Sequence, residues 1–385
     1  MNGEEPRRRR RMTILMLPND LVYNCLARVS RLYYPILSLV SKRFRSLLAS
    51  TELYQTRTLL GRTECCLYVC LRLHSGTQTL RWFTLSREPI NSTKTLVPIS
   101  SPNSPSALWS DAVMVGPNIY AIGGLVNDNA SSSVMVMDCR SHTWREAPPM
   151  RVAREFHSDT WREAPPIPMR TYREFLHSAC VLDGKIYVPG GSEDLDLTNW
   201  MEVLDTKTQT WEFFQIPSKE IFEGSKYLTA VYEGTFFVKC VYKHVMYKVH
   251  KGRWRAADII LKDSWGDRRY SCYCVIENVF YRYNDSKINW YDFNDRVRKT
   301  LKGFVGLPSL TRFSLAKMVD YRGKMALLWE EHVFVDNRKE TRFWCAEIAI
   351  EKRHKQEIWG VVEWSGVVST TSKPYSLAHV LATTI

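Results

Sequence analysis

The spacing of apolar residues changes near residue 65 and divides the chain into two parts. In the first part apolar residues recur every three to four positions, which is typical of amphipathic helices. One stripe contains Leu21, Val22, Cys25, Leu26 and Val29, and a second contains Ile36, Leu37, Val40, Phe44, Leu47 and Leu48. We expect Asn19 or Asp20 to cap the first helix and Pro35 to begin the second. The pattern predicts a helical unit over residues 15–60 that is too short to bury its own apolar side.

From residue 66 onward, short apolar segments separated by turn residues predict β-strands, and two of the segments are copies of each other. Each copy contains a Gly pair, an Asp 14 residues later and a Trp six residues after the Asp. The first copy has Gly123, Gly124, Asp138 and Trp144, and the second has Gly190, Gly191, Asp205 and Trp211. The clearest repeats therefore span residues 107–147 and 177–215.

Weaker copies without the Gly pair continue the series at 231–254, 275–292 and 318–348. The first strands, 67–73 and 80–85, lack a complete repeat of their own. We expect the alternating segment 376–385 to complete their sheet, because this would remove an exposed edge. The Ser/Pro-rich stretch 91–110 is interpreted as a loop between repeats.

A short duplication interrupts the repeats. Thr143 to Pro149 recurs as Thr160 to Pro166, 17 residues further on. Seventeen residues are too few for a repeat, and a surface loop lengthens at small entropic cost. We therefore predict that the first copy supplies a strand and that residues from about 152 to 169 form a loop.

These residues carry two resemblances to known families. The Leu17-Pro18 start, the segment Cys25–Val29 and the segment Leu37–Leu48 together resemble an F-box. The Gly-pair repeats resemble kelch repeats, each of which is one four-stranded blade of a β-propeller. The chain as a whole is similar to the plant F-box/kelch-repeat family. The resemblance implies a small all-α F-box at 15–60 followed by an all-β kelch-type propeller at 66–385. Six blades of about 50 residues fit that length, closed by the C-terminal strand.

The resemblance also implies a function, which is the substrate-recognition subunit of a cullin-type (SCF) E3 ubiquitin ligase. The F-box would bind a Skp-type adaptor and the propeller a target protein, with no catalysis by this chain. The expected adaptor-binding residues are Leu17, Pro18, Leu21, Leu26, Ile36, Val40 and Phe44. No repeated pattern identifies the target-binding residues, and the candidate loops are 125–133, 192–199 and 330–341.

Composition narrows the function classes further. The net charge is +13, but only Arg7–Arg11 forms a dense basic run, which we interpret as a disordered tail over residues 1–14. Because the remaining charge is diluted, nucleic-acid binding is not favoured. No apolar run is long enough for a membrane span, and no secretory signal is recognisable, so we expect an intracellular protein of the cytoplasm or nucleus.

A zinc site at Cys66, Cys70 and His74 is not expected, because their segment alternates as a strand. Positions four apart on a strand lie roughly 13 Å from each other, too far for ligands of one ion. No cofactor or metal is predicted.

Two alternative functions stay open from the sequence. The first is an F-box/kelch interaction protein that acts outside a ligase. The second is a propeller enzyme, which would need a cluster of His and Tyr ligands or paired carboxylates. The nine His residues are scattered, and Glu193, Asp194 and Asp196 share one expected loop.

Overall fold

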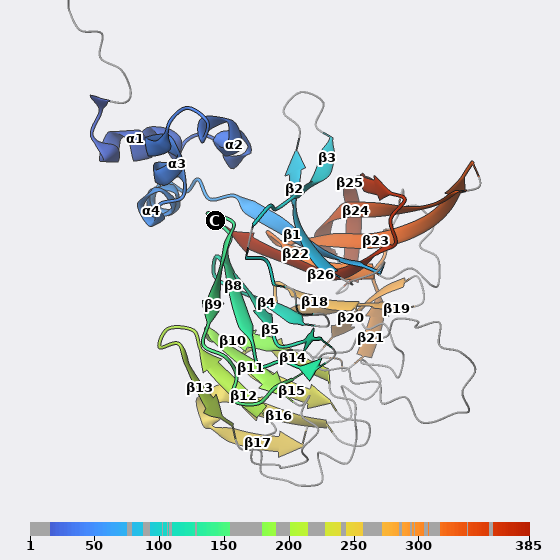
Figure 1. The fold of residues 1–385 in the computed structure, drawn as a ribbon. Helices are drawn as coiled ribbons and strands as arrows, with labels where there is room; N and C mark the ends of the chain where they lie inside the picture. The colour runs from blue at the N-terminus through green and yellow to red at the C-terminus, as the bar shows by residue number, and fades with distance from the viewer. Residues whose placement is uncertain are drawn as a thin grey trace, which may run out of the picture. The chain divides into compact units, whose positions relative to one another are not determined.

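The chain divides between Glu64 and Cys65 into a helical unit and a β unit, with the last residue, Ile385, in the helical unit (Figure 1). The structure is a computed structural model. It describes residues 16–74, 79–87, 93–101, 103–105, 107, 110–127, 129–154, 179–189, 201–214, 228–239, 244–256, 272–284, 287–292, 295, 297–303, 307, 316–336, 338–353 and 357–385.

Short helices form the helical unit. They are α1 (Asn19–Leu26), the 3-10 turn η2 (Arg31–Tyr33), α2 (Tyr34–Leu37), α3 (Lys42–Leu48) and α4 (Thr51–Leu59). Ser50 caps α4, because its hydroxyl accepts a hydrogen bond from the Leu53 amide at 3.4 Å. Within the described residues, no helix has the length and apolar character needed to cross a membrane.

Two local expectations about these helices are wrong. The second apolar stripe is not one helix, because α2 ends at Leu37 and α3 begins at Lys42. Ser41 separates them, and its hydroxyl accepts a hydrogen bond from the Phe44 amide at 3.1 Å, which caps α3. Neither Asn19 nor Asp20 caps α1, since the N-cap position is Pro18, which makes no side-chain hydrogen bond.

A buried arginine fills part of the interior of the helical unit. Arg57 of α4 is 1% exposed. Its Nη1 donates to the Val29 carbonyl at 2.8 Å and to the Tyr34 hydroxyl at 2.9 Å, and its Nη2 donates to Glu64 at 2.8 Å. Tyr34 in turn donates to the Leu26 carbonyl at 3.0 Å. These bonds join α4 to α2, to the turn after α1 and to the segment after α4.

The β unit is a six-blade propeller. Among the described residues it has six four-stranded sheets, in which neighbouring strands such as β1 and β2 pair antiparallel. The sheets lie around a common centre (Figure 1). Blade one has the order β26 (Tyr375–Thr384), β1 (Cys65–Leu73), β2 (Thr79–Arg87) and β3 (Lys94–Pro98). Blade two has β4 (Asp111–Val115), β5 (Asn118–Ile122), β8 (Val134–Asp138) and β9 (Thr143–Ala147), with the small pair β6 (Leu125–Val126) and β7 (Asn129–Ala130) between β5 and β8.

The other four blades each follow the chain order. Blade three has β10 (Cys180–Leu182), β11 (Lys185–Pro189), β12 (Met201–Asp205) and β13 (Thr210–Phe213). Blade four has β14 (Leu228–Tyr232), β15 (Thr235–Lys239), β16 (His244–Lys248), the 3-10 turn η5 (Val249–Lys251) and β17 (Arg253–Ala256). Blade five has β18 (Cys272–Ile276), β19 (Val279–Asn284), β20 (Lys287–Asp292) and β21 (Val297–Thr300). Blade six has β22 (Ala316–Tyr321), β23 (Lys324–Val335), β24 (Arg338–Arg353) and β25 (Glu357–Thr371).

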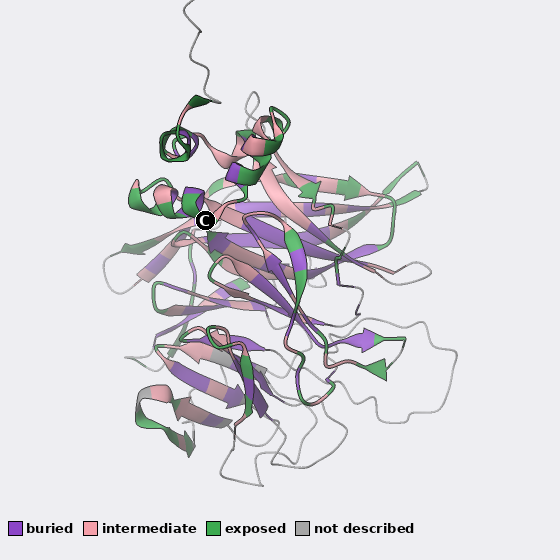
Figure 2. Cartoon of the chain, turned by 60° about the vertical axis from the view of Figure 1, so that its left-hand side comes forward, coloured by how far each residue is buried: buried purple, intermediate pink, exposed green. Residues whose placement is uncertain are grey.

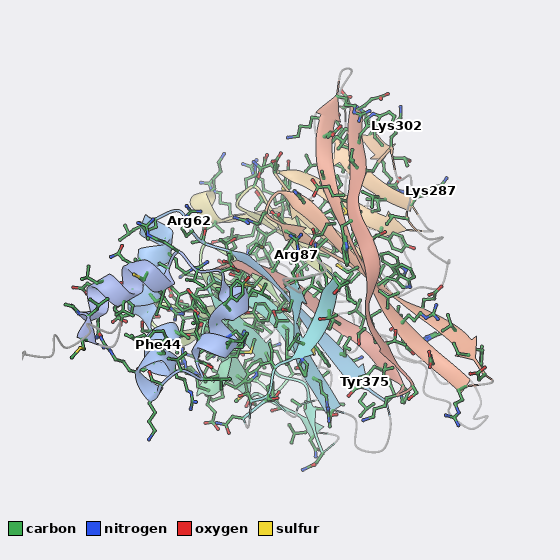
Figure 3. The ribbon with its side chains drawn as sticks, turned by 90° about the horizontal axis from the view of Figure 1, so that it is seen from above. Phe44, Arg62, Arg87, Lys287, Lys302 and Tyr375 are labelled. Carbon is green, nitrogen blue, oxygen red and sulfur yellow. The ribbon has the colours of Figure 1, made fainter. Side chains whose placement is uncertain are left out.

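The C-terminal strand closes the ring, as the sequence predicts. β26 pairs with β1 along its length, from Tyr375 opposite Leu73 to Thr384 opposite Cys65. Figure 3 labels Tyr375 at the start of this strand. Apolar side chains of both strands, including Leu377 of β26, belong to one buried cluster with residues of blade six. All six blades contain buried residues (Figure 2).

Other repeat expectations have mixed outcomes. The first copy of the duplicated segment supplies β9, as predicted, whereas residues 155–178 lie outside the described residues. The stretch 91–110 is not only a loop, because it contains β3. The candidate loop 330–341 is largely the ends of β23 and β24, which pair with each other up to Val335 opposite Arg338. These two strands are 12 and 16 residues long, so their hairpin extends beyond β22.

The closing strand gives the first prediction. Leu377→Ala should lower the free energy of unfolding of the propeller by about 2–5 kcal/mol, because it leaves a cavity in the cluster shared by blades one and six. Thr384→Ala on the same strand replaces an exposed side chain that bonds only weakly to the Cys65 thiol, and it should cost no more than about 1 kcal/mol. Chemical denaturation of both variants checks this, and equal stabilities would contradict the role given to β26.

Candidate functional site

Exposed apolar side chains occur in α2, in the turn that follows it and near the start of α1. Leu21 of α1 is 52% exposed, and Ile36, Leu39 and Val40 are 67%, 76% and 58% exposed. Ile36, Leu39 and Val40 lie three and four positions apart, a spacing that makes side chains neighbours on a helical turn. We call these four residues the apolar face. Leaving so much apolar surface in water is unfavourable for a small unit, which indicates a binding surface.

The structure separates the seven expected adaptor-binding residues into two groups. Pro18, Leu21, Ile36 and Val40 are exposed, and Leu17 is half-buried. Leu26 and Phe44 are 3% and 4% exposed, and both belong to the core of the helical unit. Phe44 is labelled among the helices in Figure 3. The two buried residues therefore support the face from inside.

Sequence reasoning missed Leu39, the most exposed residue of the apolar face. A continuous helix would place Ile36, Val40 and Phe44 on one stripe and Leu39 to the side of it. The turn over Ser38–Val40 rotates Leu39 outward, and its Leu39 and Val40 amides donate to the Ile36 and Leu37 carbonyls at 3.1 Å. The cap at Ser41 was the available signal, since a Ser there competes with helix continuation.

Two parts of the apolar face come from segments that are distant in sequence, and Arg43 links them. Its Nη2 donates to the Leu17 carbonyl and to the Asn19 side chain, both at 2.7 Å. Arg43 follows Val40 by three residues, so this contact brings the start of α1 close to the turn that carries Val40. Arg43 therefore joins the Leu-Pro start to α3, the helix that follows the second part of the apolar face.

In the propeller, the first Gly pair lies where β5 ends. Gly123 and Gly124 have φ values of 59° and 100°, which glycine adopts without strain. The Gly123 amide donates to the Ser133 carbonyl and the Gly124 amide to the Arg154 carbonyl, both at 2.8 Å. The pair thus turns the chain and fastens the segment after β9. Gly190 and Gly191 lie outside the described residues.

The Asp of each repeat holds a tight turn between two strands. Asp138 accepts a hydrogen bond from the Arg140 amide at 2.9 Å, and Asp205 accepts one from the Lys207 amide at 2.9 Å. Side-chain acceptors of this kind replace a backbone partner in the turn. The two Asp residues are therefore structural.

The Trp of each repeat packs between neighbouring blades. The Trp144 ring lies 5.9 Å from the Trp82 ring of blade one, measured between centroids. Trp211 donates from Nε1 to the Pro148 carbonyl, in the segment that follows blade two, at 2.7 Å. Both Trp side chains are buried, so the spacing that revealed the repeats reflects contacts between blades.

The first strands of neighbouring blades contact one another in pairs at the centre of the ring, and those of blades one, two and six carry polar groups there. His379 of β26 donates from Nε2 to the Ser110 carbonyl at 3.0 Å, and its Nδ1 lies 4.0 Å from Asp111 of β4. Burial, with Lys317 of β22 and Arg72 of β1 nearby, lowers the pKa of His379 to about 3. Burial also raises the pKa of Asp111 to about 6. His379 is thus neutral at physiological pH and does not form an ion pair with Asp111.

Glu330 of β23 is a second buried acid. It is 7% exposed and accepts a hydrogen bond from the Leu377 amide at 3.1 Å. Burial raises the pKa of Glu330 to about 7. Among the described residues, no group of three or more His, Cys, Asp or Glu could hold a metal ion. Glu193, Asp194 and Asp196 lie outside the described residues.

Comparisons with known proteins agree with this architecture. Residues 14–56 match the F-box domain, and residues 82–369 match the family described as FKB95, Kelch-repeats domain. An F-box/kelch-repeat protein of Arabidopsis thaliana is 54% identical over 386 residues, covering 97% of this chain and 95% of the relative. The chain belongs to the F-box/kelch-repeat family.

Two further Arabidopsis thaliana relatives are named as putative F-box/kelch-repeat proteins. One is 49% identical over 378 residues, covering 96% of each chain, and the other is 54% identical over 327 residues, covering 85% of this chain and 96% of the relative. The kelch match of this F-box/kelch-repeat protein ends at residue 369, before the closing strand β26. The two domains point to a substrate-adaptor role, which F-box/kelch proteins generally fill without catalysis of their own.

The buried acid Glu330 gives a pH-dependent prediction. Its folded-state pKa of about 7 exceeds the ordinary value of 4.5, so the folded state binds the proton more tightly than the unfolded state. The stability that the protonated Glu330 contributes is therefore lost as the pH rises from the ordinary pKa of 4.5 through the folded-state pKa of about 7. Glu330→Gln should raise the free energy of unfolding by up to about 3 kcal/mol at pH 8 and by much less at pH 5.

Urea denaturation at both pH values measures this difference. Glu340→Gln removes one negative charge from the facing strand β24 and controls for net charge. If Glu330→Gln changed stability equally at pH 5 and pH 8, the raised pKa would be refuted.

Proposed function

We propose that this chain is the substrate receptor of a cullin-type (SCF) ubiquitin ligase. The F-box binds a Skp-type adaptor, the adaptor joins the chain to a cullin, and the propeller holds the target protein. This chain supplies no chemistry. It raises the rate of ubiquitin transfer by holding the target near a recruited enzyme, which is catalysis by proximity.

The apolar face is the observation that carries this proposal. The interior of the F-box is already filled by Phe44, by Leu26 and by the hydrogen-bonded Arg57. Leu21, Ile36, Leu39 and Val40 have no place inside, and they remain exposed. An apolar partner surface would remove them from water, and central apolar residues of interfaces commonly dominate the binding energy.

The adaptor contact gives a direct prediction. Leu21→Ala and Ile36→Ala should each weaken binding of a purified Skp-type adaptor about thirtyfold, which corresponds to a loss of about 2 kcal/mol. Leu59→Ala is the matched control, because Leu59 is 87% exposed but lies at the end of α4. Isothermal titration calorimetry of the full chain with the adaptor measures all three affinities.

Undiminished adaptor binding by both variants would reject the apolar face as the docking surface. Ligase membership has a separate test, in which the chain is captured with the adaptor and a cullin. Cullin recovery that depends on the adaptor and on Ile36 supports a ligase receptor. Adaptor binding without cullin recovery would instead favour an interaction protein that acts outside a ligase.

A further inference from the structure

Arg43 makes a contact within the helical unit whose purpose the proposed adaptor binding does not explain. It is the second residue of α3, and its Nη2 donates to both the Leu17 carbonyl and the Asn19 Oδ1 at 2.7 Å. The two acceptors belong to residues 17–19, which enter α1; we call them the Leu17–Asn19 corner. One charged donor thus spans 26 residues of sequence to hold this corner.

Among the described residues, the helix cap that would ordinarily fix the Leu17–Asn19 corner is missing. Pro18 occupies the N-cap position of α1 and makes no side-chain capping bond. The first backbone bond of the helix runs from the Val22 amide to the Pro18 carbonyl at 3.2 Å. α1 has only eight residues, so its own hydrogen bonds cannot hold it without tertiary contacts. Asn19, the expected cap, uses its side-chain oxygen to accept from Arg43 instead.

The contact also fixes the residues that lead into the apolar part of α1. Leu21 follows the corner by two residues, and the buried side chains of Val22 and Leu26 hold the rest of α1. If the corner were released, the start of α1 before Leu21 would no longer be fixed to α3. A surface that becomes ordered only on binding has a lower affinity, because the entropy lost on ordering makes the free energy of binding less favourable.

We propose that Arg43 is a positioning residue for adaptor binding, which holds the Leu17–Asn19 corner in the conformation that the adaptor recognises. This inference rests on the proposed function of the apolar face. Arg43 acts through the corner and through Leu21. Its role is therefore distinct from a general attraction between a basic F-box and an acidic partner.

A matched pair of charge-removing variants separates the two explanations. Arg43→Gln and Arg45→Gln each remove one positive charge from α3, but the Arg45 side chain is exposed and makes no contact with the corner among the described residues. Arg43→Gln should weaken binding of the Skp-type adaptor about tenfold, because a charge-assisted hydrogen bond is lost. Arg45→Gln should change it less than about twofold, as expected for a screened surface charge.

Two further variants and a second readout test positioning itself. Arg43→Lys should recover part of the affinity, and Asn19→Ala should weaken binding less than Arg43→Gln, because the Leu17 carbonyl still accepts from Arg43. Hydrogen exchange of the Val22 amide in the free full chain should become faster in Arg43→Gln and stay unchanged in Arg45→Gln. All measurements are made well below the unfolding midpoint, so that a change in global stability does not alter the result.

The outcomes distinguish this inference from the function it rests on. If the wild-type chain binds the adaptor and Arg43→Gln binds it as tightly as the wild type, the positioning role is wrong and the proposed function stands. If Arg43→Gln and Arg45→Gln lose the same affinity, the effect is general electrostatics, and the positioning role is again wrong. If the wild-type chain does not bind a Skp-type adaptor, the proposed function fails and the inference fails with it.

Discussion

The propeller depends on the pairing of its last strand with its first. Each blade packs against two neighbours, so a ring of six has no free end only when β26 completes the sheet that β1 begins. Without that strand, β1 would present an unpaired edge, and blade six would lose the cluster that Leu377 helps to form. The centre of the ring has the same dependence, because His379 of β26 donates a hydrogen bond to the carbonyl of Ser110, which directly precedes blade two.

The F-box is built under a different constraint, which is its size. A unit of this length cannot bury all of its apolar residues, and the guanidinium of Arg57 occupies part of its interior. The two terminal nitrogens of that group donate to carbonyls, to Tyr34 and to Glu64, and these hydrogen bonds offset much of the cost of burying it. The helices are thus held together by polar bonds as well as by Leu26 and Phe44. The remaining apolar residues stay outside, where a partner can cover them.

Much of the fold could be predicted from the sequence, because periodic patterns report local geometry. The Gly, Asp and Trp spacing predicted two blades, the weaker copies predicted others, and the alternation after Ser376 predicted the closing strand. The break between α2 and α3 could not be read from the apolar stripe, because a single cap at Ser41 overrides its periodicity. For the same reason the stripe places Phe44, which is buried, beside Ile36 and Val40, and it leaves out the exposed Leu39. The contacts of Arg43 and Arg57 join residues that are distant in sequence, so no local pattern predicts them.

Hydrogen–deuterium exchange of the full chain, alone and with a Skp-type adaptor, tests the central claim most directly. If the apolar face is the docking surface, the adaptor should slow exchange in the segments around Leu21 and in residues 34–41, and leave the end of α4 near Leu59 unchanged. Protection confined to the propeller, or no protection of residues 16–41, would contradict the docking of the F-box through this face.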